Sequence, residues 1–243
     1  MSLRIILVRT KDDANIGSVA RVMKNFGLSE LFLVAPTCTL TRRAYALASH
    51  AGDVLERALI HTTLQDAIAG CTTVLGTTAR SRSSQGFQVL VPRDLSALLP
   101  RQGGAVVFGP EDKGLSNEEL DLCQGYVRIP TAAYASLNLA QAVNLIAYEW
   151  FLGRQASPAE AEPADIAPRE ELEAMYAQLL ELFHTIGYTD AQRQASIIRL
   201  YRRLIDRAEP SSREVAALRG LWSQAKWAAD QPPAALPGRR EER

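Results

Sequence analysis

The sequence predicts an α/β domain with a mostly parallel sheet, followed by a small all-helical domain. In the first half of the chain, short apolar runs alternate with stretches of helical periodicity, which is typical of successive βαβ units. From residue 169 to residue 229, amphipathic helical patterns follow one another without a strand signal. Residues 155–168 are rich in Ala, Glu and Pro, as in a flexible linker. We therefore expect domains at 1–154 and 169–229, and a disordered tail at 230–243.

The composition is that of a globular protein. The chain has 243 residues, of which 47% are hydrophobic and 22% are charged, enough for a sizeable core. Basic and acidic residues balance, so net charge alone indicates no nucleic-acid partner. No segment resembles a signal peptide or a membrane span, which favours a cytoplasmic protein with no membrane partner. Cys38, Cys71 and Cys123 are scattered, as are the three histidines, so we expect neither a metal site nor a disulfide framework.

Five apolar runs predict the strands, at residues 3–8, 31–35, 73–77, 105–108 and 126–129. Asn15 is a good N-cap for the helix after the first strand, whose apolar residues keep helical spacing until Gly27. Residues 42–69 are predicted to be helical with breaks. Ser116 and Glu119 form an S-x-x-E capping box for a short helix.

The helix predicted at 139–152 is apolar around most of its circumference. A surface helix of a monomer normally has one polar face. We therefore expect this helix to be buried, either within its own domain or against a second subunit.

Three loops that follow strands carry polar residues suited to ligand binding. The first holds Asn15 and Gly17, with Arg21 about one and a half turns further along the helix. Gly17 permits close approach of another backbone or of a ligand, and Arg21 offers a planar, permanently charged fork to a phosphate. A capped helix with an exposed arginine explains the same residues without a ligand.

The second loop runs from Phe108 to Ser116, between a strand and a capped helix. Ligands of open α/β sheets bind where such loops gather, at the carboxyl ends of the strands. Glu111 can accept hydrogen bonds from a ligand or orient an arginine. The lysine precedes the second glycine, so this is not a P-loop, and no G-x-G-x-x-G follows any strand.

The third loop starts at Ile129 and Pro130 and leads into the apolar helix, with Ser136 and Asn138 at the helix start. Free N–H groups and the positive end of the helix dipole gather there. Ordinary capping is the alternative explanation. A fourth loop, after the third strand, carries Arg80 and Arg82, which suit either phosphate contacts or plain solvation.

The C-terminal domain has a basic stripe. Arg199, Arg202, Arg203 and Arg207 fall opposite an apolar face made by Ile197, Ile198, Tyr201, Leu204 and Ile205. A basic stripe of this kind is expected for contacts with a nucleic-acid backbone, although a solvated helix face has the same pattern.

The three loop motifs together resemble those of the SPOUT superfamily of RNA methyltransferases. They are N-x-G-x-x-A-R at Asn15 to Arg21, F-G-P-E-x-x-G-L at Phe108 to Leu115, and the segment from Ile129 to Val143. The match is to the ribose 2′-O-methyltransferase branch called SpoU or TrmH-like. The helical C-terminal part is similar to that of the TrmJ family, tRNA (cytidine/uridine-2′-O)-methyltransferases that act at the first nucleotide of the anticodon loop, position 32.

The resemblance implies the SPOUT fold, with a deep trefoil knot in the C-terminal half of the sheet. It also implies a homodimer, tRNA as substrate and S-adenosylmethionine as cofactor, bound at the subunit boundary. The residues that it implies for cofactor binding are Leu75, Gly76, Thr77, Thr78, Phe108, Gly109, Glu111, Gly114, Ile129, Pro130, Ser136, Leu137 and Asn138.

The catalytic group implied by the resemblance centres on Arg21, which would bind the adjacent phosphate and stabilise a developing alkoxide. A guanidinium stays charged above pH 12, so it is not the literal base. Asn15, Tyr134, Ser136, Asn138 and Glu111 would orient the ribose, the arginine or the cofactor loop. RNA contacts would come from Arg21, from Arg80 and Arg82, and from the C-terminal arginine stripe.

Two other functions stay open from the sequence. The motifs define the reaction better than the substrate, so a ribose methyltransferase for another tRNA or ribosomal RNA site is the first alternative. A catalytically silent RNA-binding relative is the second, although the intact Asn15, Arg21, Glu111, Ser136 and Asn138 argue against it.

Overall fold

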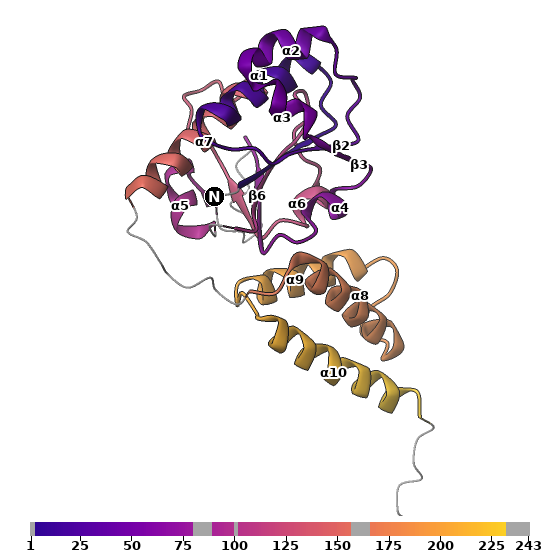
Figure 1. The fold of residues 1–243 in the computed structure, drawn as a ribbon. Helices are drawn as coiled ribbons and strands as arrows, with labels where there is room; N and C mark the ends of the chain where they lie inside the picture. Colours follow the sequence, from indigo (N-terminus) through magenta and orange to yellow (C-terminus); the bar gives the residue numbers. More distant parts are fainter. Residues whose placement is uncertain (1–2, 80–88, 100–101, 157–165, 232–243) are drawn as a thin grey trace, which may run out of the picture. The chain divides into compact units, whose positions relative to one another are not determined.

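The computed structural model describes residues 3–79, 89–99, 102–156 and 166–231. The chain divides into two compact units, Met1–Glu170 and Glu171–Arg243, and each is described by itself (Figure 1). The first is an α/β unit, as the sequence predicts, and the described part of the second is helical.

The first unit is built on a seven-stranded sheet in the order β3-β2-β1-β6-β4-β7-β5. Every described strand pair is parallel. The carboxyl ends of the strands therefore meet at one edge of the sheet. The strands are β1 (Leu3–Val8), β2 (Leu31–Val34), β3 (Leu59–His61), β4 (Thr73–Thr77), β5 (Val89–Leu90), β6 (Gly104–Phe108) and β7 (Gly125–Val127).

All five predicted strands are present, and two more lie at the edges of the sheet. The stretch predicted to be helical at 42–69 contains β3, in which Leu59 and Ile60 are 52% and 66% exposed. The other missed strand, β5, has two residues. Short strands that bury little apolar surface leave almost no periodic signal, so the sequence predicts only the buried centre of the sheet.

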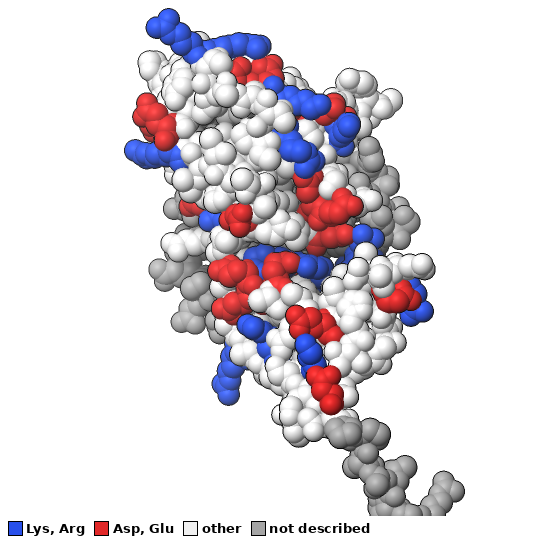
Figure 2. Space-filling model, turned by 90° about the vertical axis from the view of Figure 1, so that its right-hand side faces the viewer, with Lys and Arg blue, Asp and Glu red and all other residues white. Residues whose placement is uncertain are grey.

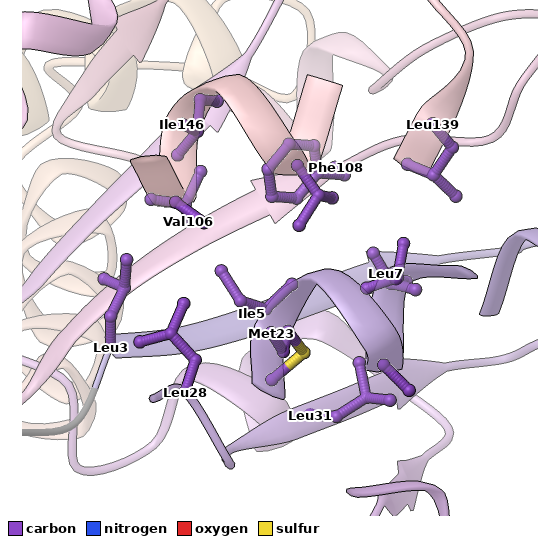
Figure 3. Close-up of a cluster of buried hydrophobic side chains, with 14 of the residues drawn as sticks. Leu3, Ile5, Leu7, Met23, Leu28, Leu31, Val106, Phe108, Leu139 and Ile146 are labelled. Atoms are coloured by element: carbon purple, nitrogen blue, oxygen red, sulfur yellow. The ribbon is translucent and has the colours of Figure 1, made fainter. Parts of the chain in front are cut away.

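Helices cover both faces of the sheet. They are α1 (Asp13–Asn25), α2 (Arg42–Ala48), α3 (Gly52–Glu56), α4 (Leu64–Ile68), α5 (Leu95–Leu98), α6 (Asn117–Leu120) and α7 (Leu139–Ala156), with short 3-10 turns η1 (Ser49–Ala51) and η3 (Pro92–Asp94). One apolar cluster joins α1, α2, α3, α5 and α7 to the sheet, and Figure 3 shows its side chains from β1, α1, β2, β6 and α7. The other joins α4 and α6 to the opposite face.

The start of α1 differs from the prediction. Asp12, not Asn15, is the N-cap, because its side chain accepts the N–H of Ala14 at 3.0 Å. Asn15 therefore lies inside the first turn with its side chain free for other contacts. The end agrees with the prediction: Gly27 adopts a φ of +69°, and the N–H of Leu28 returns to the carbonyl of Met23.

Gly17 is needed for helix packing. A Cβ at this position would lie 2.1 Å from the carbonyl oxygen of Ala44 in α2. Of the two partners allowed by the sequence, a backbone or a ligand, the structure places a backbone there.

Helix α8 (Arg169–Thr185) begins at the end of the first unit and continues into the second. The described part of the second unit also contains α9 (Gln194–Asp206) and α10 (Ser212–Ala229). Its small core contains Met175, Tyr176, Leu179 and Val215.

Helix α7 runs to Ala156, inside the stretch predicted as a linker. At the other end of that stretch Ala167 is buried, and the N–H of Arg169 donates to the carbonyl of Cys71. The predicted domain boundaries stay a prediction. None of the helices described is long and apolar enough to cross a membrane.

Candidate active site

A cavity of about 300 Å³ opens at the carboxyl ends of β4, β6 and β7. It is lined by residues of three loops and of the start of α7: Thr77, Thr78, Ala79, Phe108, Gly109, Pro110, Glu111, Asp112, Lys113, Gly114, Leu115, Val127, Ile129, Ala135, Ser136, Leu137, Leu139 and Ala142. Two of these loops, after β6 and β7, are among the three in which the residues themselves predict a ligand, and the loop after β4 is one that the family resemblance implies for the cofactor. The structure therefore brings segments that are far apart in the chain to one site.

Nine of the thirteen predicted cofactor residues line this cavity, and four do not: Leu75, Gly76, Pro130 and Asn138. Leu75 is buried in the apolar core. A Cβ on Gly76 would lie 2.8 Å from a Leu120 methyl, so this glycine is needed for packing against α6. Both residues lie within β4, and the cofactor contacts that the resemblance implies for them stay a prediction.

The loop after β6 owes its shape to its two glycines. A Cβ on Gly109 would lie 2.3 Å from the backbone of Gly114 and Leu115, so the loop can fold back on itself only with glycine at this position. Gly114 has a φ of +68°, and its N–H donates to the carbonyl of Pro110 at 2.9 Å. The tight turn presents the loop's backbone to the cavity.

A hydrogen-bond relay connects the three motifs to Glu111, which lines the cavity. The Asn15 Nδ2 donates to Glu111 Oε1 at 2.8 Å, and the Asn138 Nδ2 donates to Asn15 Oδ1 at 2.9 Å. The Asn138 Oδ1 accepts the N–H of Ala140 at 2.9 Å, at the start of α7.

The polarity of this relay is determined by its two ends. A carboxylate can only accept and a helix N–H can only donate, so each asparagine amide between them has one permitted orientation. Asn15 is therefore the central residue of the relay, which explains why its side chain does not cap α1.

Lys11 also contacts the loop after β6, a contact that no pattern in the sequence predicts. Its backbone N–H donates to Glu111 Oε2 at 3.2 Å, and its Nζ donates to Asp112 Oδ2 at 2.7 Å. The hydrogen bond from Lys11 lowers the pKa of Asp112 from its ordinary value. An ion pair between residues 101 positions apart leaves no periodic or spacing signal, so only the structure reveals it.

Of the remaining predicted catalytic residues, Ser136 lines the cavity, whereas Arg21 and Tyr134 do not. Arg21 is exposed on α1, and Tyr134 is 81% exposed on the loop before α7. Within a single chain, Glu111 and Ser136 line the cavity and hydrogen bonds connect Asn15 and Asn138 to Glu111, whereas Arg21 does not line the cavity.

The structure contradicts the predicted position of Arg202 on the arginine stripe, whereas its contact with RNA stays a prediction. Its guanidinium forms two 2.5 Å hydrogen bonds with the Glu173 carboxylate and lies 4.5 Å from the centre of the Tyr176 ring. Arg202 thus packs towards α8, whereas Leu204, predicted to be on the apolar face, is 54% exposed. Helical spacing defines two faces but does not say which face meets the neighbouring helix, and a paired arginine can pack inward.

The other predicted RNA contacts have varied positions. Arg199 and Arg203 are half-buried on α9, and Arg207 is exposed at its end. Arg80 and Arg82 lie outside the described residues. Figure 2 shows basic and acidic side chains interspersed on one face of the molecule, in keeping with the balanced composition. Among the described residues, no group of three His, Cys, Asp or Glu side chains is placed to hold a metal ion.

Comparison with known proteins identifies the family. Residues 2–148 match the SpoU rRNA Methylase family. The chain belongs to this family. Residues 170–234 match a second family, described as the C-terminal domain of the tRNA methyltransferase TrmJ. The two matches together span both units of this SpoU-family protein.

Two relatives that match over about nine-tenths of the chain carry the name TrmJ. The tRNA (cytidine/uridine-2′-O-)-methyltransferase TrmJ of Yersinia pestis is 39% identical over 231 residues, which are 90% of each chain. The crystal structure of TrmJ from Z. mobilis ZM4 has a TM-score of 0.77 at 37% identity, covering 91% of this SpoU-family chain and 97% of that one. The SpoU methyltransferase AviRb from Streptomyces viridochromogenes, in complex with the cofactor AdoMet, shares the fold, with a TM-score of 0.51 at 21% identity, covering 65% and 61%.

Proposed function

We propose that this protein transfers a methyl group from S-adenosylmethionine to a ribose 2′-hydroxyl of tRNA. The target that we propose is the cytidine or uridine at the first position of the anticodon loop, position 32. The names of the full-length relatives support tRNA as the substrate. The observation that carries the proposal is the relay through Glu111, Asn15 and Asn138, because it connects all three motifs to a residue in the wall of one cavity.

The cavity has the properties that a nucleoside cofactor requires. Its apolar wall, with Phe108, Val127 and Leu139, suits a flat base, and the backbone of three loops supplies hydrogen-bonding groups. The tight turn between Gly109 and Gly114 lets a ligand approach main-chain atoms closely. We assign cofactor binding to these three loops. When bound, S-adenosylmethionine supplies a methyl group on a sulfonium that leaves readily, so the protein's main task is to position the reactants.

Arg21 is the residue that we propose to bind the target's phosphate and to stabilise the oxygen as its proton leaves. Ser136, at the cavity, and Tyr134, on the same loop, would orient the ribose. Arg21 does not line the cavity of its own chain. We therefore propose that a homodimer completes the site, with Arg21 of the partner subunit beside the cavity.

The face of α7 that is left uncovered supports such a dimer. Leu145, Tyr148 and Leu152 are 39%, 45% and 40% exposed, and their spacing puts them on one side of the helix. Exposed apolar stripes of this kind mark protein interfaces. From membership of the family we also infer a trefoil knot in the C-terminal half of the sheet, and action on tRNA in the cytoplasm.

The test is methyl transfer to unmodified tRNA transcripts, followed by mapping of the modified nucleotide. Modification of the ribose at position 32 is the expected result. Modification of another tRNA or ribosomal RNA nucleotide would contradict the proposed substrate but support the proposed reaction. Binding of tRNA without any methyl transfer would make the protein a silent relative.

Arg21→Ala provides the sharper test of the catalytic assignment. We expect it to abolish methyl transfer while changing the affinity for S-adenosylhomocysteine less than about twofold, because Arg21 does not line the cavity. The measurements are single-turnover methyl transfer and calorimetry. Arg57→Ala, which removes another exposed arginine of the same unit, is the control and should retain activity. Wild-type turnover by Arg21→Ala would contradict the assignment.

A further inference from the structure

The connection between β1 and α1 contacts the loop after β6 near both of its ends. Arg9, the first residue after β1, forms a two-pronged ion pair with Glu119: Nη1 with Oε1, and Nη2 with Oε2 at 3.0 Å. Glu119 also accepts the N–H of Ser116 at 2.8 Å, and Ser116 Oγ accepts the N–H of Glu119. Arg9 is thereby tied to the residue at which the loop ends and α6 begins.

The second contact is made by Lys11, two residues later. Its N–H and its ammonium hold the adjacent carboxylates of Glu111 and Asp112, near the start of the loop. The two anchors hold the segment 109–115, which supplies seven of the eighteen residues that line the cavity. Movement of this segment therefore changes much of the cavity wall.

The backbone at Arg9 shows that its position is determined by its surroundings. Arg9 has a φ of +48°, in the left-handed region that residues other than glycine seldom adopt. Its N–H donates to the carbonyl of Val34 in β2 at 2.8 Å, and its side chain is held by Glu119. A strained conformation persists where several contacts fix it, and such residues cluster at ligand sites.

We propose that Arg9 and Lys11 are positioning residues that hold the loop 109–116 in the shape that binds the cofactor. This inference rests on the proposed function of the cavity. Arg9 is the stronger anchor, because its pair is two-pronged and the Glu119 side chain is only 12% exposed. Lys11 and Asp112 are 53% and 43% exposed, and a solvated ion pair contributes little.

The test is the affinity for S-adenosylhomocysteine, measured by calorimetry without RNA. We expect Arg9→Ala to weaken binding about tenfold, and Lys11→Ala about twofold to fourfold. Lys24→Ala is the matched control for Lys11. It removes a 2.6 Å ion pair with Asp53, equally exposed, at residues that do not line the cavity, so affinity should stay within about 1.5-fold.

Two further measurements separate positioning from simple loss of stability. Positioning predicts that KM for S-adenosylmethionine rises with the dissociation constant while kcat at saturation is retained, and that Arg9→Lys restores part of the affinity. An Arg9→Ala protein that melts earlier but binds S-adenosylhomocysteine like wild type would overturn the inference. If Arg9→Ala does not fold, Glu119→Gln gives the same test, because it weakens the ion pair and keeps the shape of the side chain.

Failure of the proposed function would look different. In that case the wild-type protein would not bind S-adenosylhomocysteine, and both proposals would fall together. If the wild-type protein binds S-adenosylhomocysteine and the Arg9 and Lys11 variants bind it with the same affinity, only the positioning role is refuted.

Discussion

Asn15 shows how much one side chain can determine at this site. Its amide donates to Glu111 and accepts from Asn138, so it needs both an N–H group and a carbonyl oxygen. Only asparagine provides the two at this length, since glutamine is longer and aspartate cannot donate. The relay, and not a preference for asparagine at a helix N-cap, therefore explains why residue 15 is asparagine.

Asn15→Asp should consequently be more harmful than Asn15→Ala. The aspartate would face the Glu111 carboxylate at hydrogen-bond distance, and two like charges repel, whereas alanine only removes two hydrogen bonds. We expect kcat/KM for methyl transfer to fall about tenfold for Asn15→Ala and about a hundredfold or more for Asn15→Asp. Asn25→Asp, an exposed position at the other end of α1, is the control. Equal losses for the two Asn15 variants would show that the relay does not have the stated polarity.

The site residues divide by how they could be found. Asn15, Glu111, Ser136 and Asn138 stand in recognisable motifs on loops after strands, and the sequence places them together. Arg9 and Lys11 make their contacts across about a hundred residues through ion pairs, and no local pattern predicts the partner of a charged side chain. Local motifs in the sequence thus indicate the residues of the relay and the cavity, but not the ion pairs that hold the loop after β6.

At the scale of elements, the sequence predicts what is buried and misses what is exposed. The strands β1, β2, β4, β6 and β7 are mostly buried, and the apolar runs in the sequence predict all five. They do not predict the edge strands β3 and β5. The faces of α9 were assigned wrongly at Arg202 because amphipathic spacing carries no information about an ion pair with another helix. Packing partners, unlike periodicity, are a property of the folded chain.

Two helical glycines provide a test of packing at this scale. In α1, a Cβ on Gly17 would overlap the Ala44 carbonyl oxygen, whereas in α10 a Cβ on Gly220 would meet nothing within 4 Å. Alanine is favoured over glycine within a helix by about 1 kcal/mol. We therefore expect Gly220→Ala to stabilise the protein by up to about 1 kcal/mol, and Gly17→Ala to destabilise it by about 2–3 kcal/mol through forced separation of α1 and α2.

Urea unfolding of the full chain, followed by circular dichroism, measures both changes. Because each variant adds the same methyl group to a helix, the comparison isolates the space around the glycine. A stabilised Gly17→Ala protein would mean that α1 and α2 do not pack as closely as described.

At the scale of the whole molecule, the missing arginine and the uncovered apolar face lead to the same conclusion. The cavity of one chain lacks Arg21, and α7 exposes Leu145, Tyr148 and Leu152. A symmetric dimer has two equivalent sites, and each can draw residues from both subunits. Neither observation alone requires a dimer, but a dimer accounts for both.

Mixed dimers can decide whether Arg21 acts across the interface. Arg21→Ala should be inactive, and Asn138→Asp should lose most of its activity, because its carboxylate cannot donate and would face the Asn15 Oδ1 that accepts from the native amide. In a heterodimer of the two, one site has an intact cavity and faces the intact Arg21 of the partner subunit. After co-expression with two different tags, the purified mixed dimer should therefore have about half of wild-type activity, since one of its two sites is complete. If Arg21 instead served the cavity of its own chain, no site in the heterodimer would be complete and activity would stay absent. Tandem affinity purification of the mixed dimer, followed by methyl transfer to tRNA, distinguishes these two arrangements. Replacing Leu145 and Tyr148 by serine should abolish the recovered activity if α7 forms the interface.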